Sequence, residues 1–225
     1  MAGQDPPLHV PRYEVDVYVD ASGQLLPVSA EDAAEGFGDN RDYHDLRGIT
    51  WREAKDALGR EIDLLSGLEP SDTADAFERA VEEIEDVLGD EINPLFWTVD
   101  LGVTGLVATL SAAGYVTTYS CRGHPHGRGC AHPVVRLACD RARLEALVSC
   151  VTRVGCGLVV DGLVEVWDRS VAGLLTLAQE ILRRRDELAH LPALELSDGE
   201  DGDRSTDQIA EGDGLRPGPG QLPLF

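Results

Sequence analysis

The sequence predicts an α+β fold in which helices pack on one face of an antiparallel or mixed sheet. From residue 101 onward, segments with helical spacing and segments rich in β-branched residues follow one another in the order α-β-β-α-β-β-α. Asp161-Gly162 separates two β-branched runs, which is a strong signal for a β-hairpin. Apolar residues make up 43% of the chain, enough to fill a core. We place this main domain at residues 96–190.

The segment 1–48 is expected to hold one strand and otherwise irregular chain. Residues 13–19, YEVDVYV, alternate apolar with acidic side chains, as an edge or half-buried strand does. Residues 29–48 are rich in Ala, Gly, Asp and Asn and give no clear element. We therefore expect the first helix only after residue 48.

The segment 49–95 is expected to be helical. Thr50 and Glu53 have the spacing of a capping box, and the helix that they begin should run to about Leu65. Asp72 is the expected cap of a second helix, which ends before Gly89. The apolar residues of this second helix recur at helical spacing: Phe77, Ala80, Val81, Ile84, Val87 and Leu88. Its other face is acidic, and we interpret that face as solvated rather than as a metal or partner site: Glu78, Glu82, Glu83, Glu85 and Asp86.

The main domain should begin with a buried helix at 101–113, because that segment is apolar nearly all round. Strands are expected at 115–119 and 134–139. Asp140 should cap the next helix, which has a glycine stop at Gly155. After the hairpin, Ser170 should cap a last helix that continues to Leu188.

The balance of charge limits the functions that fit this chain. It has 41 acidic and 19 basic residues, for a formal net charge of −22. Such a body repels phosphates, so strong direct binding to duplex DNA is not expected. No segment has the apolar length of a membrane span, and residues 1–11 lack the features of a signal peptide. We expect a cytoplasmic protein with reduced cysteines.

A loop rich in cysteine and histidine follows the first strand of the main domain. The spacing C-x2-H, five residues, C-x-H places Cys121, His124, Cys130 and His132 as ligands of a zinc ion, with His126 as an alternate. Cys121 and His124 are also candidates for nucleophile and base. The alternative is a surface loop whose histidines are merely exposed, while Cys139 and Cys150 are core thiols.

The last five residues form a separate feature. Residues 191–220 are expected to be a disordered acidic linker, and Gln221, Leu222, Leu224 and Phe225 follow it. This order resembles the bacterial sliding-clamp-binding motif, Gln-Leu-x-Leu-Phe. The resemblance implies that Gln221 enters a polar subsite and that Leu224 and Phe225 fill an apolar pocket of the clamp. The alternative is that Leu224 and Phe225 pack on the chain's own domain.

The string Ser120-Cys121-x-Gly123-His124 carries a second, shorter resemblance. It is similar to the Ser-Cys-Ser-Gly-Arg motif of the wybutosine-synthesis methyltransferase-like proteins, which act on a modified tRNA guanosine; His124 stands where that family has Arg. Two hypotheses follow. The first is a clamp-binding accessory or regulatory protein of DNA replication or repair. The second is an enzyme that modifies nucleotides or nucleic acids with the 120–133 loop, with zinc as its cofactor.

Overall fold

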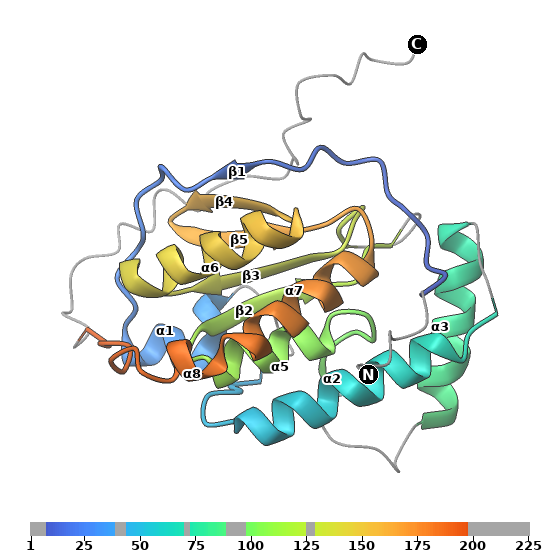
Figure 1. Cartoon of the computed structure of the whole chain (residues 1–225), viewed down its shortest axis with the longest axis horizontal. Coiled ribbons are helices and arrows are strands. Elements are labelled where there is room, and N and C mark those ends of the chain that lie inside the picture. Colours follow the sequence, from blue (N-terminus) through green and yellow to red (C-terminus); the bar gives the residue numbers. More distant parts are fainter. Residues whose placement is uncertain (1–7, 39–43, 70–72, 89–97, 125–128, 198–225) are drawn as a thin grey trace.

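The computed structural model describes residues 8–38, 44–69, 73–88, 98–124 and 129–197. It is an α+β structure (Figure 1). Its strands are β1 (Val19–Asp20), β2 (Val116–Cys121), β3 (Val134–Ala138), β4 (Gly157–Asp161) and β5 (Leu163–Trp167). Its helices are α1 (Ala30–Glu35), η1 (Gly36–Gly38), α2 (Trp51–Ser66), α3 (Ala74–Leu88), α5 (Thr104–Ala112), α6 (Arg141–Val154), α7 (Val171–Arg183) and α8 (Arg185–Leu188).

The five strands form one mixed sheet in the order β1-β4-β5-β3-β2. All neighbours are antiparallel except β1, which runs parallel to β4 at the edge. The predicted hairpin is confirmed: β4 and β5 turn at Gly162, whose φ of +74° suits glycine, and Asp161 pairs with Leu163. The predicted order of elements from residue 101 is therefore correct.

The helices of the main domain lie together on one face of the sheet (Figure 1). Alternation along β3 explains this arrangement: Val135 and Leu137 point into the large core shared with α5, α6 and α7, whereas Val134 and Ala138 point to the other face. α2 packs on the outer side of α5, whose residues from Thr104 to Ser111 are all buried. The predicted buried helix is confirmed.

Local signals in the sequence mark most helix ends. Thr50 and Glu53 form the capping box at the start of α2. Asp140 and Ser170 accept backbone N–H groups at the starts of α6 and α7. Gly155 ends α6 in the left-handed region, at φ +84°. For α3 the expected cap, Asp72, lies outside the described residues, and the Thr73 hydroxyl accepts the N–H of Ala76.

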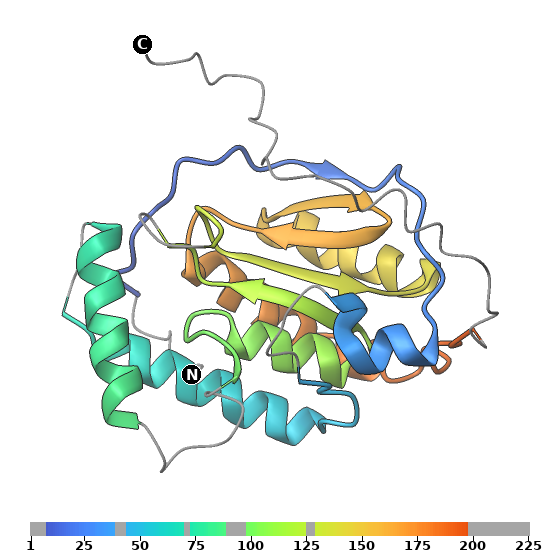
Figure 2. The ribbon, with the colours of Figure 1, turned by 180° about the vertical axis from the view of Figure 1, so that it is seen from behind.

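The N-terminal segment departs from the prediction. The strand expected at 13–19 is reduced to Val19–Asp20, because the residues before it are tied by isolated hydrogen bonds instead of a ladder. The Tyr13 N–H donates to Arg169 O at 2.7 Å, and Trp167 Nε1 donates to Asp16 O at 2.9 Å. Helix α1, capped by the Ser29 side chain, was not predicted, and it covers the sheet face opposite to the other helices (Figure 2). Six residues are too few to show a helical period.

Further differences concern α3, the last helix and the linker. Val87, expected in the core, is 83% exposed. The last helix breaks at Arg184, which separates α7 from α8. Residues 191–197, assigned to the linker, lie against the domain: Arg143 donates to Pro192 O at 2.7 Å, and the Ser197 N–H donates to Val28 O at 2.8 Å. In the part of the chain that the structure describes, no helix has the length and apolarity to cross a membrane.

Candidate functional site

Strand β2 delivers Cys121 to the edge of the core, and the chain then turns through Arg122, Gly123 and His124. Gly123 has a φ of +89°, and a Cβ there would lie 2.8 Å from the backbone of His132. Only glycine allows the two arms of the loop to approach this closely. The Tyr13 hydroxyl donates to Gly123 O at 3.1 Å, and the His124 N–H donates to Cys130 O at 2.8 Å. The loop is thus fixed on both sides of Gly123.

Arg122 is buried and joins this loop to helix α3. Its guanidinium binds Glu78 in a bidentate pair, at 3.1 and 2.9 Å, and donates to Glu85 at 2.8 Å. Its backbone N–H donates to Asp100 Oδ2 at 3.2 Å. The interpretation of the whole acidic face of α3 as solvated is therefore wrong for Glu78 and Glu85, which face Arg122. Glu82, Glu83 and Asp86 are exposed as expected.

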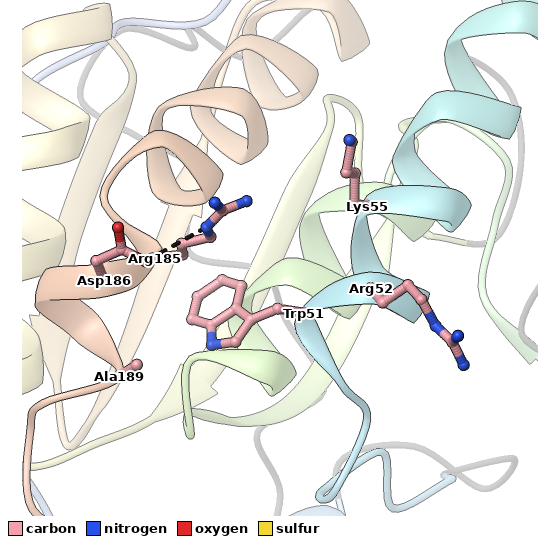
Figure 3. Close-up of a pocket in the computed structure, with 6 residues that line it drawn as sticks. All are labelled: Trp51, Arg52, Lys55, Arg185, Asp186 and Ala189. Carbon is pink, nitrogen blue, oxygen red and sulfur yellow. Dashed lines mark hydrogen bonds and ion pairs between the residues drawn. The ribbon is translucent and has the colours of Figure 1, made fainter.

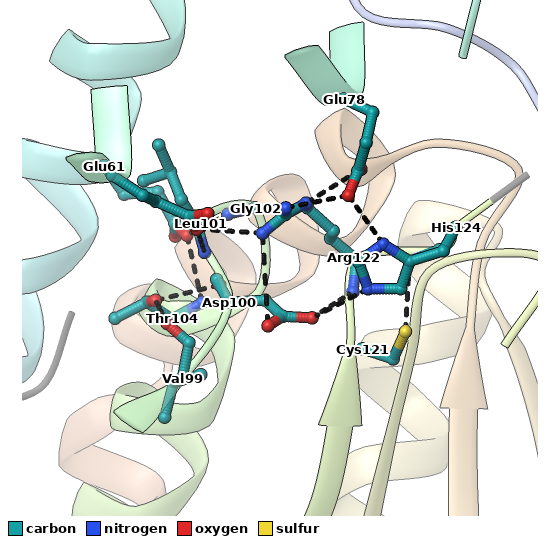
Figure 4. Close-up of polar contacts among 12 residues, drawn as sticks. Glu61, Glu78, Val99, Asp100, Leu101, Gly102, Thr104, Cys121, Arg122 and His124 are labelled. Carbon is teal, nitrogen blue, oxygen red and sulfur yellow. Dashed lines mark hydrogen bonds and ion pairs between the residues drawn. The ribbon is translucent and has the colours of Figure 1, made fainter. Parts of the chain in front are cut away.

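His124 lies among three acidic groups (Figure 4). Its Nδ1 is 2.7 Å from Glu78 Oε1, and its Nε2 is 3.6 Å from Asp100 Oδ2. The ring also hydrogen-bonds the Cys121 sulfur. Asp100, then Cys121 and Glu78, raise the pKa of His124 to about 11, so this imidazole holds its proton.

The Cys121 thiol is only 2% exposed and is held in its ionised form by its neighbours. Hydrogen bonds from Cys130 first, and then from His124, lower its pKa well below the ordinary value, although burial opposes this shift. The pKa of Cys130 is raised by its bond to Cys121 and by burial, and the Tyr119 hydroxyl lies 3.5 Å from its sulfur. Cys121 is thus the thiolate of the pair and Cys130 the thiol.

A buried glutamate of helix α2 holds the backbone that directly follows Asp100. The Glu61 carboxylate accepts the backbone N–H groups of Gly102, Thr104 and Gly105 at 2.6, 2.9 and 2.6 Å, and so caps α5 from outside (Figure 4). The Thr104 hydroxyl donates back to Asp100 O at 3.0 Å. Burial raises the pKa of Glu61 to about 7, while the three N–H groups lower it.

Sequence reasoning identified neither Glu61 nor Asp100. For Glu61 a signal existed, because it occupies an inward position of α2, in register with Ala54, Ala57, Leu58 and Leu65. A glutamate on an apolar stripe indicates a buried polar contact. For Asp100 the sequence offered no comparable signal, since its partners in the site are far away along the chain.

The structure brings together two of the predicted ligands and adds a third. Among the residues that the structure describes, the side chains of Asp100, Cys121 and His124 have donor atoms that all lie within 4.8 Å of one another, so this group could hold a metal ion. Cys130 neighbours Cys121 but is not part of the group, and neither is His132. His126 and the peptide 221–225 lie outside the described residues.

A separate hollow of about 350 Å³ lies between the start of α2 and α8 (Figure 3). Its lining residues are Trp51, Arg52, Lys55, Arg185, Asp186 and Ala189. Lys55 is the only lysine in the chain. This lining has no thiol, imidazole or other member of the Cys–His loop, so the hollow is distinct from the candidate site.

The candidate site therefore combines an ionised thiol, an imidazole and a carboxylate around a buried arginine. This set of groups suits metal binding, or thiol chemistry assisted by His124. Comparisons of the chain with protein-family models, with curated proteins and with solved structures found no significant match.

Proposed function

We propose that this chain is an accessory or regulatory protein of DNA replication or repair, recruited to the bacterial sliding clamp by its C-terminal peptide. One observation carries the proposal: Gln221, Leu222, Leu224 and Phe225 occupy all four defining positions of the clamp-binding motif. Pro223 stands at the tolerant third position, where it favours an extended peptide and reduces the entropy lost on binding. Such an assignment implies a cytoplasmic protein.

The charge of the chain supports recruitment by a protein partner. At a net charge of −22 the molecule repels nucleic acid, so a peptide contact with the clamp supplies the proximity to DNA that the body does not. Between Ser197 and Gln221 there are 23 residues, 198–220. Their composition predicts a flexible linker, for which a chain of 23 residues has a root-mean-square span of about 26 Å, taking ~5.5 Å times the square root of 23. This reach suits a tethered ligand.

The test is a titration of the clamp with a labelled peptide spanning residues 218–225. We expect micromolar affinity, about −8 kcal/mol. The peptide with Leu224→Ala and Phe225→Ala should not bind, because burial of these two side chains contributes roughly 3–6 kcal/mol. Gln221→Ala should weaken binding without abolishing it. A full-length double variant should lose clamp binding and keep its unfolding midpoint. Absence of binding by both peptide and full-length protein at roughly 100 μM would refute the proposal.

A second candidate function is favoured by the contact between Cys121 and His124. In this alternative the 120–133 loop belongs to an enzyme that modifies nucleotides or nucleic acids, with zinc as its cofactor. Cys121 is almost fully buried, whereas a nucleophile must meet its substrate, so its surroundings suit a zinc ligand better than an attacking group. The faint likeness to wybutosine-synthesis proteins points to the same class of substrate.

This second function is tested by mass spectrometry of nucleotides, transfer RNA and single-stranded DNA after incubation with the full chain. The matched control is Cys121→Ser, and a third arm contains a chelator. A product that depends on Cys121 and on metal supports the enzyme. Unmodified substrates in every arm, with zinc present, would exclude this activity for the substrates used.

A further inference from the structure

We propose that Asp100, Cys121 and His124 form a mononuclear centre for a divalent transition-metal ion such as Zn²⁺, that Glu78 positions His124, and that the fourth coordination position is open. The inference rests on the second candidate function, whose site it specifies, and it is independent of the clamp peptide. It replaces the ligand set Cys121, His124, Cys130 and His132 that sequence spacing suggested.

The donor atoms are of the types that zinc binds, and one of their separations equals a tetrahedral edge. A thiolate, an imidazole nitrogen and a carboxylate oxygen come from the end of β2, the loop after it and the loop before α5, and all lie within 4.8 Å of one another. Zinc bonds of about 2.0–2.3 Å in a tetrahedron place neighbouring ligand atoms about 3.3–3.7 Å apart. The 3.6 Å between His124 Nε2 and Asp100 Oδ2 matches this edge.

Glu78 holds the histidine in the orientation that a metal ligand needs. Its carboxylate binds His124 Nδ1 at 2.7 Å, which leaves Nε2 directed toward Asp100 (Figure 4). Histidine ligands of metals commonly give their other ring N–H to a carboxylate, which fixes the tautomer and strengthens the ligand. Glu78 is itself fixed by the bidentate Arg122. Glu78 and Arg122 thus already hold His124 in the orientation of a metal ligand.

The charge at the site also favours a cation. Three carboxylates, those of Glu78, Glu85 and Asp100, surround the single guanidinium of Arg122. These three carboxylates and one guanidinium sum to −3 + 1 = −2, a charge that a divalent ion would balance. A partly buried excess of negative charge is costly, so the ion is stabilised there.

The fourth coordination position should remain open because, among the residues that the structure describes, neither Cys130 nor His132 belongs to the mutually close donors. Cys130 instead hydrogen-bonds the Cys121 sulfur and lies 3.5 Å from the Tyr119 hydroxyl. Three protein ligands with one open position is the arrangement of catalytic zinc, whereas structural zinc normally has four protein ligands. A water molecule or a substrate atom would occupy the fourth position.

The experiment measures metal binding by the full chain, first freed of metal with a chelator. Zn²⁺ affinity is obtained by competition with a chromophoric chelator, and Co²⁺ serves as a spectroscopic substitute. We expect one ion per chain and a thiolate-to-cobalt charge-transfer band. Cys121→Ser should abolish the band, and Asp100→Asn and His124→Gln should each lower affinity at least 100-fold. Glu78→Gln should lower affinity about 10–100-fold, as loss of an orienting carboxylate does.

Matched variants separate ligands from neighbours. Asp86→Asn and Glu83→Gln, on the exposed face of α3, should bind Zn²⁺ like the wild type. Cys130→Ser and His132→Gln should keep one ion per chain. Loss of the ion in either of these two, its retention in Cys121→Ser, or no Zn²⁺ binding by the wild type at micromolar free metal would overturn the inference.

Circular dichroism of each metal-free variant checks its fold. If Asp100→Asn does not fold, His124→Gln decides, because His124 is partly exposed and lies outside the core. The clamp titration is the independent arm: Cys121→Ser should keep clamp binding, and the Leu224→Ala, Phe225→Ala double variant should keep the metal. Failure of one proposal is thus distinguishable from failure of the other.

Discussion

Replacing Glu61 with glutamine should destabilise the fold, because one buried backbone N–H group, that of Gly105, loses its hydrogen-bond acceptor. In the wild type, Oε1 accepts the N–H groups of Gly102 and Thr104, and Oε2 accepts that of Gly105 at 2.6 Å. The glutamine oxygen can keep two of these bonds, but its amide nitrogen has no lone pair to offer Gly105. A buried donor left without an acceptor costs about 1–3 kcal/mol. At pH 5 the free energy of unfolding of Glu61→Gln should therefore be lower than that of the wild type by about 1–3 kcal/mol.

The pH dependence gives this prediction a second readout. Burial raises the pKa of Glu61 from 4.5 to about 7 in the folded chain. Between these values the folded state holds a proton that the unfolded state releases, so the contribution of Glu61 to stability falls as pH rises through this window. The variant has no such group. The advantage of the wild type over Glu61→Gln should therefore shrink from pH 5 to pH 8.

The assay is urea unfolding of wild type, Glu61→Gln and the exposed control Glu83→Gln at pH 5, 6, 7 and 8. Comparing each variant with the wild type at the same pH removes the titration of all other groups. Hydrogen exchange of the Gly105 amide should also be faster in Glu61→Gln than in the control. Equal stability of wild type and Glu61→Gln at pH 5, or an advantage that grows with pH, would refute the reasoning.

Three other variants test the packing of the fold and of the site. Gly59→Ala should raise the free energy of unfolding by about 0.5–1 kcal/mol, since this exposed glycine lies inside α2 and a Cβ would meet no atom within 4 Å. A lower urea midpoint would contradict this prediction. Gly123→Ala should lower the free energy of unfolding by about 1–3 kcal/mol, because φ is +89° and the Cβ would clash with the backbone of His132. An unchanged urea midpoint would show that the loop can adopt another backbone conformation. Arg122→Met should lower the free energy of unfolding by about 3–5 kcal/mol, since it removes the guanidinium that pairs with Glu78 and Glu85. That loss should diminish at acidic pH, where protonation removes the unpaired charge, and a loss independent of pH would point to packing alone.

Two of the four residues of the candidate centre, Cys121 and His124, could be predicted from the sequence, because they are close together along the chain. Cys121 and His124 are three residues apart in one glycine-rich loop, so their spacing alone indicated a shared site. Glu78 is 46 residues from His124, and Asp100 is 22 residues from Arg122. Nothing local distinguishes Glu78 from Glu82 on the same helix; only the packing of α3 against the loop gives it a partner.

The sequence by itself determined the order of the elements and most of their ends. Capping side chains, glycine stops and the Asp161-Gly162 turn act within a few residues, so their effect does not depend on the rest of the fold. The tertiary structure alone decided which strand lies at the sheet edge, that α1 covers the face opposite to the main helices, and that a buried arginine gathers three carboxylates beside Cys121 and His124. These features depend on contacts between segments that are distant in the sequence. Such contacts form only when the chain folds, so local sequence patterns do not reveal them.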